Sequence, residues 1–284
     1  MLISKLYVPV LLVLLVCSGC DLINPAEPVP AYIDLRDPEL VIPASQAGTQ
    51  GSASEKISNT WLFLNNRPLG VFNRTGHIPV IGDGENMITA VAGIMENGVA
   101  AVRVIYPFYT TDTTIAVLSP NGDIVVDPVY NYIPSTVFSL NEGFEVGSAI
   151  ESWNDSPATI ELSSADVFEG SRSARIALVD TAEWFNGRSV QIMTLPVDGT
   201  PIYLELNYKT DVVLQIGLQE TTTGETVYNW NISPRSDWNK IYLNLQNVVL
   251  SAGSPMFRLL IRAQKPGDLQ SAQIFLDNVK LVHF

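Results

Sequence analysis

Side chains that could carry out catalysis are sparse in this sequence. It has two histidines, His77 and His283, and neither lies near a serine or cysteine in a nucleophile motif. The sequence has no HExxH pair and no glycine-rich phosphate loop. Two carboxylates held about 5–10 Å apart could hydrolyse a glycosidic bond, but some pair among 29 acidic residues would meet that distance in any fold. We therefore expect that the protein is not an enzyme.

Four aromatic residues have neighbours that suit a sugar-binding surface. A flat ring stacks on the C–H face of a pyranose, and amide or carboxylate groups beside it supply hydrogen bonds. Trp184 and Phe185 lie in a polar, loop-like stretch, residues 181–187, where an exposed ring would be unusual without a ligand. Tyr228 and Trp230 alternate along a predicted strand and should share one face. That face is either a binding surface or the interior of a sandwich.

The N-terminus has the features of an export signal. Lys5 precedes an apolar run over residues 6–17, and small residues follow it, which is the order found in a secretory signal peptide. A membrane-spanning helix takes about 20 apolar residues, so this run is too short to span. We expect residues 1–19 to be a signal peptide.

The stretch Val16-Cys17-Ser18-Gly19-Cys20 resembles the lipobox of bacterial lipoproteins, in which a small residue precedes the cysteine that receives diacylglycerol. Cys17 stands where leucine is usual. No other cysteines occur, so cleavage would leave Cys20 alone at the mature N-terminus, where a thioether to lipid explains it most simply. The resemblance implies an acyl lipid on Cys20 and an outer-membrane lipoprotein, on the cell surface or the periplasmic face. Asp21 is compatible with either orientation.

Composition argues against a nucleic-acid partner and indicates β structure. The net charge is −13, from 16 basic and 29 acidic residues, whereas phosphate binding needs clustered Lys and Arg. Hydrophobic residues make up 46% of 284, enough for two cores at about 150 residues per domain. The 18 prolines and 19 glycines, with frequent Thr, Val, Ile and Tyr, predict short strands joined by tight turns.

The first half of the mature chain reads as a tether followed by a β-sandwich. Residues 20–31 contain three prolines, which predicts a stiff, extended segment. Residues 32–133 place turn clusters about every ten residues, as in an antiparallel sandwich. A turn is predicted at Asn65-Asn66-Arg67-Pro68. Tyr106 and Phe108 either form an exposed aromatic patch or fill the core.

Within this half, the pattern from Trp61 to Val91 resembles PEGA-type and related immunoglobulin-like repeats. It combines a strand, a surface turn, Leu69-Gly70, a proline-containing strand and the run Ile88-Thr89-Ala90-Val91. The resemblance implies an immunoglobulin-like sandwich.

The second half, residues 134–284, carries a different series of motifs. Asn141-Glu142-Gly143-Phe144-Glu145 opens it, Trp153 and Trp238 follow, and Ile274 to Leu281 closes it with Asp277-Asn278-Val279. In this order the motifs resemble those of β-jelly-roll carbohydrate-binding modules from bacterial glycosidases. The resemblance implies a galactose-binding-like jelly roll with Trp153 and Trp238 in the core. It does not imply sugar binding, because the same fold also serves adhesion and interdomain packing.

The same resemblance implies a structural Ca²⁺ between the first and last strands of the jelly roll. Its ligands would be Glu145, the backbone near Gly170 and Ser171, and Asp277. Oxygen donors from distant segments suit Ca²⁺. The alternatives are that Glu145 accepts hydrogen bonds from strand ends and that Asp277 lies in a solvated turn.

The predicted fold class is thus all-β, with two β-sandwich domains, immunoglobulin-like followed by jelly roll. The predicted function is a membrane-anchored, non-catalytic binding lipoprotein whose jelly roll holds a polysaccharide. The alternative is a structural or accessory subunit of an outer-membrane protein complex, with both sandwiches as docking surfaces.

Overall fold

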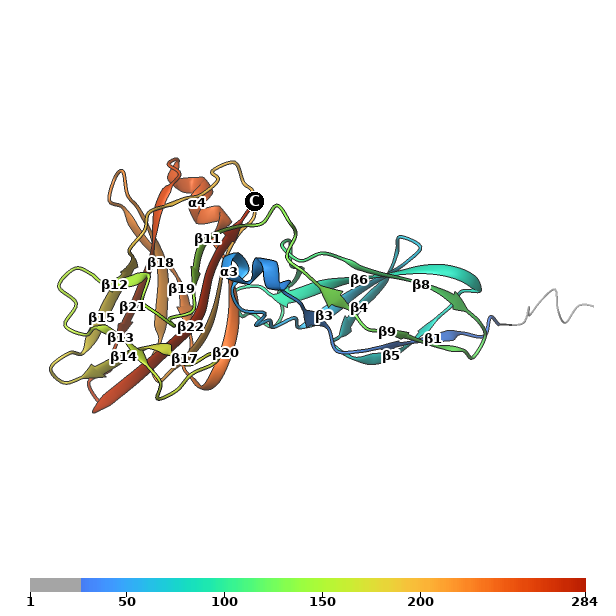
Figure 1. Ribbon diagram of the computed structural model, residues 1–284, viewed down its shortest axis with the longest axis horizontal. Helices are drawn as coiled ribbons and strands as arrows, with labels where there is room; N and C mark the ends of the chain where they lie inside the picture. Colours follow the sequence, from blue (N-terminus) through green and yellow to red (C-terminus); the bar gives the residue numbers. More distant parts are fainter. Residues whose placement is uncertain (1–26) are drawn as a thin grey trace, which may run out of the picture.

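The computed structural model describes residues 27–284, which form two β-sandwiches. One end of the first sandwich packs against one sheet of the second (Figure 1). The all-β fold class is confirmed. The predicted signal peptide and Cys20 lie outside the described residues. Within residues 27–284, no helix has the length and apolar character needed to cross a membrane.

The first sandwich consists of a three-stranded and a five-stranded sheet. In the smaller sheet β1 lies between β5 and β9, antiparallel to β5 and parallel to β9. In the larger, β3 lies between β4 and β6, and β7 and β8 pair with successive parts of β6. A short parallel pair, β2 and β10, lies beside them. The bounds are β1 Ala31–Leu35, β2 Glu39–Leu40, β3 Asn59–Leu64, β4 Arg67–Asn73, β5 Gly76–Val80, β6 Gly84–Met95, β7 Arg103–Ile105, β8 Asp112–Leu118, β9 Asp123–Val126 and β10 Val129–Tyr130.

The turn between β3 and β4 falls within the predicted stretch but is shorter, because Arg67 and Pro68 already pair with β3. Asn65 and Asn66 have φ values of 50° and 65°, and two successive residues of positive φ fit the twist of a two-residue hairpin. Asparagine tolerates this left-handed conformation better than most residues. The hairpin places Trp61 and Phe63 on the outer face of the sheet, while Leu62 packs in the core.

The second sandwich is a jelly roll of two antiparallel sheets. The inner sheet, which faces the first domain, has the order β13-β14-β22-β17-β20, with β11 also paired to β22. The outer sheet has the order β12-β15-β21-β18-β19, with β16 paired to β21, and α4 closes one end. The bounds are β11 Val137–Glu142, β12 Ile150–Ser152, β13 Ile160–Ser163, β14 Ser173–Val179, β15 Trp184–Ser189, β16 Met193–Thr194, β17 Ile202–Thr210, β18 Leu214–Glu220, β19 Thr226–Ile232, β20 Arg235–Asn244, α4 Gln246–Ala252, β21 Met256–Gln264 and β22 Ser271–His283.

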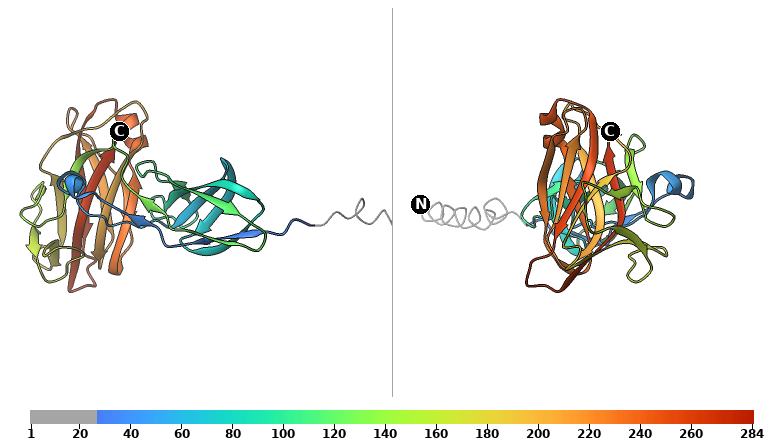
Figure 2. Two further views of the ribbon diagram at one scale, coloured as in Figure 1. Left: turned by 45° about the vertical axis from the view of Figure 1, so that its right-hand side comes forward. Right: turned by 90° about the vertical axis from the view of Figure 1, so that its left-hand side faces the viewer.

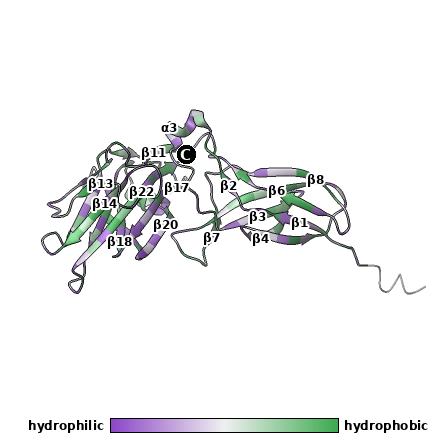
Figure 3. Ribbon diagram, turned by 60° about the horizontal axis from the view of Figure 1, so that its bottom comes forward, coloured by the Kyte–Doolittle hydropathy of each residue, from purple (hydrophilic) through white to green (hydrophobic). Residues whose placement is uncertain are grey.

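The central strands of the inner sheet are buried on both sides. In β17 every residue but Lys209 is buried, and β22 is buried from Ile274 onward. Leu204 and Leu206 face the sandwich core, whereas Tyr203 and Glu205 face the first domain. The polar first half of β20, purple in Figure 3, extends beyond the part that the first domain covers.

A buried aromatic cluster joins the two domains. Tyr106 contacts Tyr203 edge to face with ring centroids 5.4 Å apart, and Phe108 packs on Phe284 at 4.7 Å. The structure therefore excludes an exposed patch at Tyr106 and Phe108, since both are fully buried. The segment with η1 (Ala44–Gln46) and α3 (Ala47–Gln50) leaves the first sandwich and lies against the jelly roll (Figure 2).

Candidate functional site

The outer sheet of the jelly roll presents an open face on the side opposite the first domain (Figure 1). Strand alternation decides which side chains it carries. In β15, Phe185 is fully buried and belongs to the sandwich core, while Trp184 and Asn186 are half-buried on the open face. The prediction that Phe185 is an exposed platform is wrong, because this stretch is a strand rather than a loop and neighbouring residues point to opposite faces.

Four polar residues form one row across the open face. The strand register sets Asn186 of β15 opposite Arg262 of β21, Arg262 opposite Gln215 of β18, and Gln215 opposite Asn231 of β19. Arg262 Nε donates to Gln215 Oε1 at 2.8 Å, and Gln215 Nε2 donates to Asn231 Oδ1 at 2.8 Å. Asn186 Oδ1 is buried and has no hydrogen-bond partner within residues 27–284.

Tyr228 and Trp230, predicted to share a face, lie on opposite faces. Trp230 pairs with the buried Ile216 and packs against the core, whereas Tyr228 pairs with Gly217 on the open side. The register shifts by one residue between these pairs, so Asn229 is the extra residue of a β-bulge. A bulge reverses the alternation. Tyr228 therefore remains a candidate platform, and Trp230 does not.

The ring of Tyr228 is held against the sheet. A Cβ on Gly217 would lie 2.8 Å from Tyr228 Cδ1, so the ring covers a position that only glycine leaves free. The guanidinium carbon of Arg262 lies 4.3 Å from the ring centroid, within range of a cation–π contact. Burial raises the pKa of Tyr228, against the opposing charge of Arg262. The phenol therefore stays protonated at neutral pH.

A second aromatic–guanidinium pair lies at the β12 edge of the same face. Arg188 Nε is 2.8 Å from Glu151 Oε1, and the guanidinium carbon lies 5.7 Å from the Trp153 ring centroid. Trp153 is thus half-buried beside Arg188. The expectation that it lies in the core is wrong. Trp238 is also outside the core; on the inner sheet its Nε1 donates to Asp166 Oδ1 at 2.7 Å.

Of the residues predicted to bind calcium, Glu145 caps a turn. It accepts hydrogen bonds from Ser171 N at 2.9 Å, Ser171 Oγ at 2.6 Å and Arg172 N at 3.2 Å. These bonds, from the Ser171 hydroxyl above all, lower the pKa of Glu145. Gly170 lies so close that a Cβ there would be 2.1 Å from Glu145 Oε1. The N–H and O–H groups that surround this carboxylate suit an anion rather than a cation.

Asp277 is buried in β22 and is not in the solvated turn considered from the sequence. It accepts hydrogen bonds from Asn278 N at 2.8 Å and Glu169 N at 3.2 Å, and burial raises its pKa to about 6. Within residues 27–284, no group of three or more His, Cys, Asp or Glu side chains is arranged to hold a metal ion. N–H donors thus surround Glu145 and also bond to both carboxylate oxygens of Asp277, and the calcium site stays a prediction.

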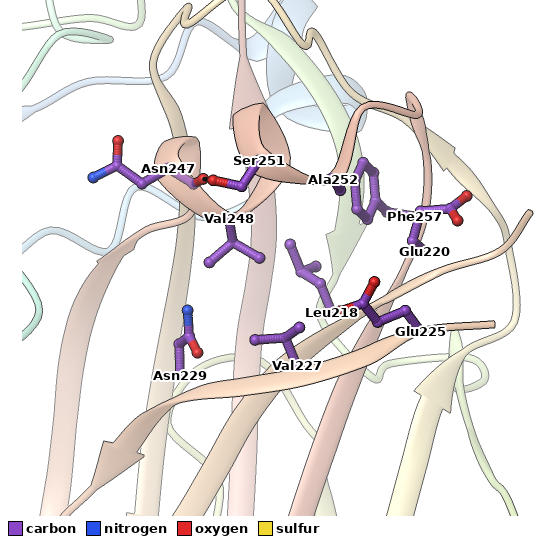
Figure 4. A pocket seen from close by; sticks show the side chains of 10 residues that line it. All are labelled: Leu218, Glu220, Glu225, Val227, Asn229, Asn247, Val248, Ser251, Ala252 and Phe257. Carbon is purple, nitrogen blue, oxygen red and sulfur yellow. Dashed lines mark hydrogen bonds between the residues drawn. The ribbon is translucent and has the colours of Figure 1, made fainter. Parts of the chain in front are cut away.

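A separate cavity of about 310 Å³ opens at one end of the sandwich, between β18, β19 and α4 (Figure 4). Leu218, Val227, Val248 and Phe257 supply its apolar wall. The bulged Asn229 and Asn247 of α4 lie at its edge. The bulge that turns Tyr228 outward therefore also brings Asn229 to this cavity.

Sequence reasoning missed the polar row, because its members come from four strands. The only sequence signal was the alternation of single polar residues, such as Gln215 and Arg262, with buried apolar ones in otherwise hydrophobic strands. That alternation indicates an outward face but not which residues of other strands lie beside it.

No protein-family model and no curated protein matches the chain. Among solved structures, it is similar to the C-terminal family 22 carbohydrate-binding module of Clostridium thermocellum Xyn10B, at 17% identity over 51% of this chain and 92% of that one, with a TM-score of 0.37. It is also similar to the module TmCBM61, at 13% identity over 50% and 94%, with a TM-score of 0.34. The enzymatically active domain of bacteriophage CBA120 tailspike protein 4 matches at 13% identity over 58% and 26%, with a TM-score of 0.42. These likenesses concern the fold of about half of the chain.

Proposed function

We propose that this protein is a non-catalytic binding protein that holds a polysaccharide on the open face of its jelly roll. The observation that carries the proposal is the row Asn186–Arg262–Gln215–Asn231 with an aromatic ring on either side of it. Planar amide and guanidinium groups form paired hydrogen bonds with neighbouring hydroxyls. A row that crosses four strands is about 14 Å long at 4.8 Å per strand, which suits a chain of sugars better than a single one.

The rings that flank the row come from the adjacent rows of the sheet. Trp184 lies two residues before Asn186 on β15, and Tyr228 pairs with Gly217, two residues after Gln215 on β18. Residues two apart in a strand point to the same side, so both rings border the polar row from opposite sides. Because Tyr228 is already fixed by Gly217 and Arg262, binding would order little further, and such preorganisation favours affinity.

Arg262→Ala tests the proposal in an isothermal titration against soluble polysaccharides chosen from a glycan array. It removes a charged donor from the row, and loss of a hydrogen bond to a charged group costs about 1.5–3 kcal/mol, or at least tenfold in affinity. Arg175→Ala is the matched control, because Arg175 Nε donates to Gln273 Oε1 at 3.1 Å on the other sheet. Equal affinities for the two variants would refute the proposed face.

A lipid on Cys20 is part of the same proposal. The described chain starts at the end of the first sandwich farthest from the jelly roll (Figure 1). Attachment through Cys20 would therefore hold the open face away from the bilayer. Cys20→Ala should move the protein from the detergent phase to the aqueous phase in Triton X-114 partitioning. A variant that stays in the detergent phase would place the anchor elsewhere.

An accessory role in an outer-membrane complex is the second candidate, and one surface favours it. On β8 of the first domain, Ile115 and Val117 are each 68% exposed, and Met87, paired with Ile115, lies on the same face. Exposed apolar patches of this kind mark protein contacts. The double variant Ile115→Lys, Val117→Lys should abolish cross-links to a membrane partner in intact cells if this role holds, and should leave polysaccharide binding unchanged.

A further inference from the structure

A basic cleft of about 490 Å³ lies between the two domains. First-domain residues, among them Lys56 and Arg74, line one side, and Arg235 and Lys240 of the jelly roll line the other. No aspartate or glutamate of the described chain lines this cleft. The concentration of cations is unusual in a protein whose net charge is −13.

Two of the four cations form ion pairs with carboxylates that do not line the cleft. Arg74 pairs with Asp37 at 2.6 Å and with Glu55 at 2.9 Å, and Lys240 Nζ lies 2.9 Å from Glu205 Oε2. These pairs hold the wall together. They leave little charge for a ligand.

The other two cations, Lys56 and Arg235, have no acidic partner within residues 27–284. Lys56 Nζ donates to the amide oxygen of Asn239, and Arg235 is exposed. Burial lowers the pKa of Lys56, and the positive charge of Arg235 lowers it further. Two cations that repel each other at a cleft, without a counter-charge, form a site that an anion would stabilise.

The cleft adjoins the polar row of the open face. Asn231 accepts the hydrogen bond from Gln215 at the end of the row and also lines the cleft. The buried Tyr208 also lines the cleft, and its hydroxyl accepts a hydrogen bond from Asn239 Nδ2 at 2.9 Å and keeps its own proton to donate. A sugar chain on the row can therefore pass over the edge of β19 into the cleft.

The geometry points to an acidic polysaccharide as the ligand class, with one of its carboxylate or sulfate groups bound between Lys56 and Arg235. This inference rests on the proposed function, because the open face supplies the rest of the binding surface. The first domain then contributes directly to ligand selection, since Lys56 belongs to it. Binding of the anionic group should weaken as salt rises, because exposed charges are screened.

The experiment compares matched polymers by isothermal titration: alginate, hyaluronan and polygalacturonate, each beside the same polymer with its carboxylates reduced to alcohols. Dextran sulfate beside dextran separates sulfate from carboxylate as the group that is bound. At least one acidic polymer should bind at least about tenfold more tightly than its neutral counterpart, as expected for a charge-assisted contact. Arg235→Ala and Lys56→Gln should each reduce that ratio toward one.

Arg67→Ala is the control, because Arg67 is an exposed cation in the β3–β4 hairpin, outside the cleft. Neutral and acidic polymers that bind equally, or a ratio that Arg235→Ala and Lys56→Gln leave intact, would overturn the cleft assignment. Arg262→Ala would still weaken binding in that case, so the open-face proposal would survive. If none of the polymers binds the wild-type protein, the proposed function itself fails.

Discussion

Each sheet of the jelly roll has one face that points away from the sandwich core, and the side chains of these two faces differ because only one face is covered. Both are built from antiparallel strands with alternating residues, yet one lies beneath the first domain and the other is open. On the covered face, Glu205 and Lys280 are fully buried among tyrosines. On the open face, Arg262 and Gln215 bond to each other and keep further donors and acceptors free. Burial requires that polar groups be satisfied within the protein, whereas a binding face keeps some of them available.

The buried group on the covered face is centred on Glu205. Tyr106 and Tyr132 donate to Glu205 Oε1 at 2.6 and 2.9 Å, and Lys240 pairs with Oε2 at 2.9 Å. Lys280 Nζ donates to the Ser52 carbonyl at 2.5 Å. Burial alone would raise the pKa of Glu205, but the charges of Lys240 and Lys280 and these hydrogen bonds hold it below its usual value. The carboxylate thus stays charged and ties both domains together.

The largest effect should come from Glu205→Ala, because it leaves two lysines buried without a counter-charge. Removing one partner of a buried ion pair costs about 3–5 kcal/mol. The matched variant on the open face is Glu151→Ala, which breaks the exposed pair with Arg188 and should cost less than about 1 kcal/mol. Guanidinium unfolding of both variants measures the difference. Similar losses in the free energy of unfolding would show that burial beneath the first domain does not distinguish the two faces.

Two neighbours in β15 sharpen the comparison within one strand. Phe185→Ala removes a core ring and should lower the free energy of unfolding by about 3–5 kcal/mol. Trp184→Ala removes a half-buried ring from the open face and should cost much less, while weakening polysaccharide binding. Urea unfolding and a pull-down on insoluble polysaccharide test both variants. If Trp184→Ala unfolds the domain, its ring belongs to the packing and the open face loses a platform.

These two neighbours also show what the sequence could predict and what it could not. Periodicity and turn residues predict the all-β class, and Asn65-Asn66 identifies its hairpin, because these signals are local. The strand that turns Phe185 inward was missed, since Glu183, Asn186 and Gly187 look like the residues of a loop. The opposite orientations of Tyr228 and Trp230 depend on a one-residue bulge whose other half is on β18. No periodicity in β19 alone reveals it.

Local sequence patterns could not predict the interface between the domains, for a different reason. Glu205 and Asn207 are single polar residues in an apolar strand, which indicates an outward face but not a covering domain. The hydroxyl that bonds Glu205 comes from Tyr106, 99 residues earlier in the chain. Only the folded chain brings this hydroxyl to Glu205, where it satisfies the buried carboxylate. The same limit applies to the basic cleft, whose cations come from both domains.

Calcium should have a smaller effect, centred on Asp277 in β22 of the inner sheet. Asp277 is a buried carboxylate whose pKa burial raises to about 6, and a bound divalent cation would offset that cost. Binding only the folded state stabilises by about 2.7 kcal/mol at 100 times Kd. Millimolar Ca²⁺ should therefore raise the melting temperature relative to EDTA at pH 7.5, and Asp277→Asn should remove the difference. Identical melting curves for the wild-type protein in both solutions would exclude the site.

The smallest effect, counted per pH unit, should be a pH dependence that arises from the covered face. Burial lowers the pKa of Lys280 to about 7, although the charge of Glu205 opposes that shift, whereas an unfolded lysine titrates near 10.4. Between pH 7 and 10 the unfolded chain therefore holds one proton more than the folded one. Stability should then rise with pH, by at most about 1.4 kcal/mol per unit from this group. Below pH 7 both states are protonated, and the dependence from Lys280 vanishes.

Above pH 10 the trend should reverse, because burial raises the pKa of Tyr106 well above its usual value and only the unfolded chain then loses phenolic protons. The measurement is urea unfolding of the wild-type protein and of Lys280→Met at half-unit steps from pH 6 to 10. The variant should lack the rise that begins at pH 7, while Arg67→Ala, which removes an exposed cation of the β3–β4 hairpin, should keep it. Parallel curves for the wild-type protein and Lys280→Met would mean that Lys280 titrates as a solvated lysine. The first domain would then leave that part of the inner sheet open to water, and the contrast between the two faces would be lost there.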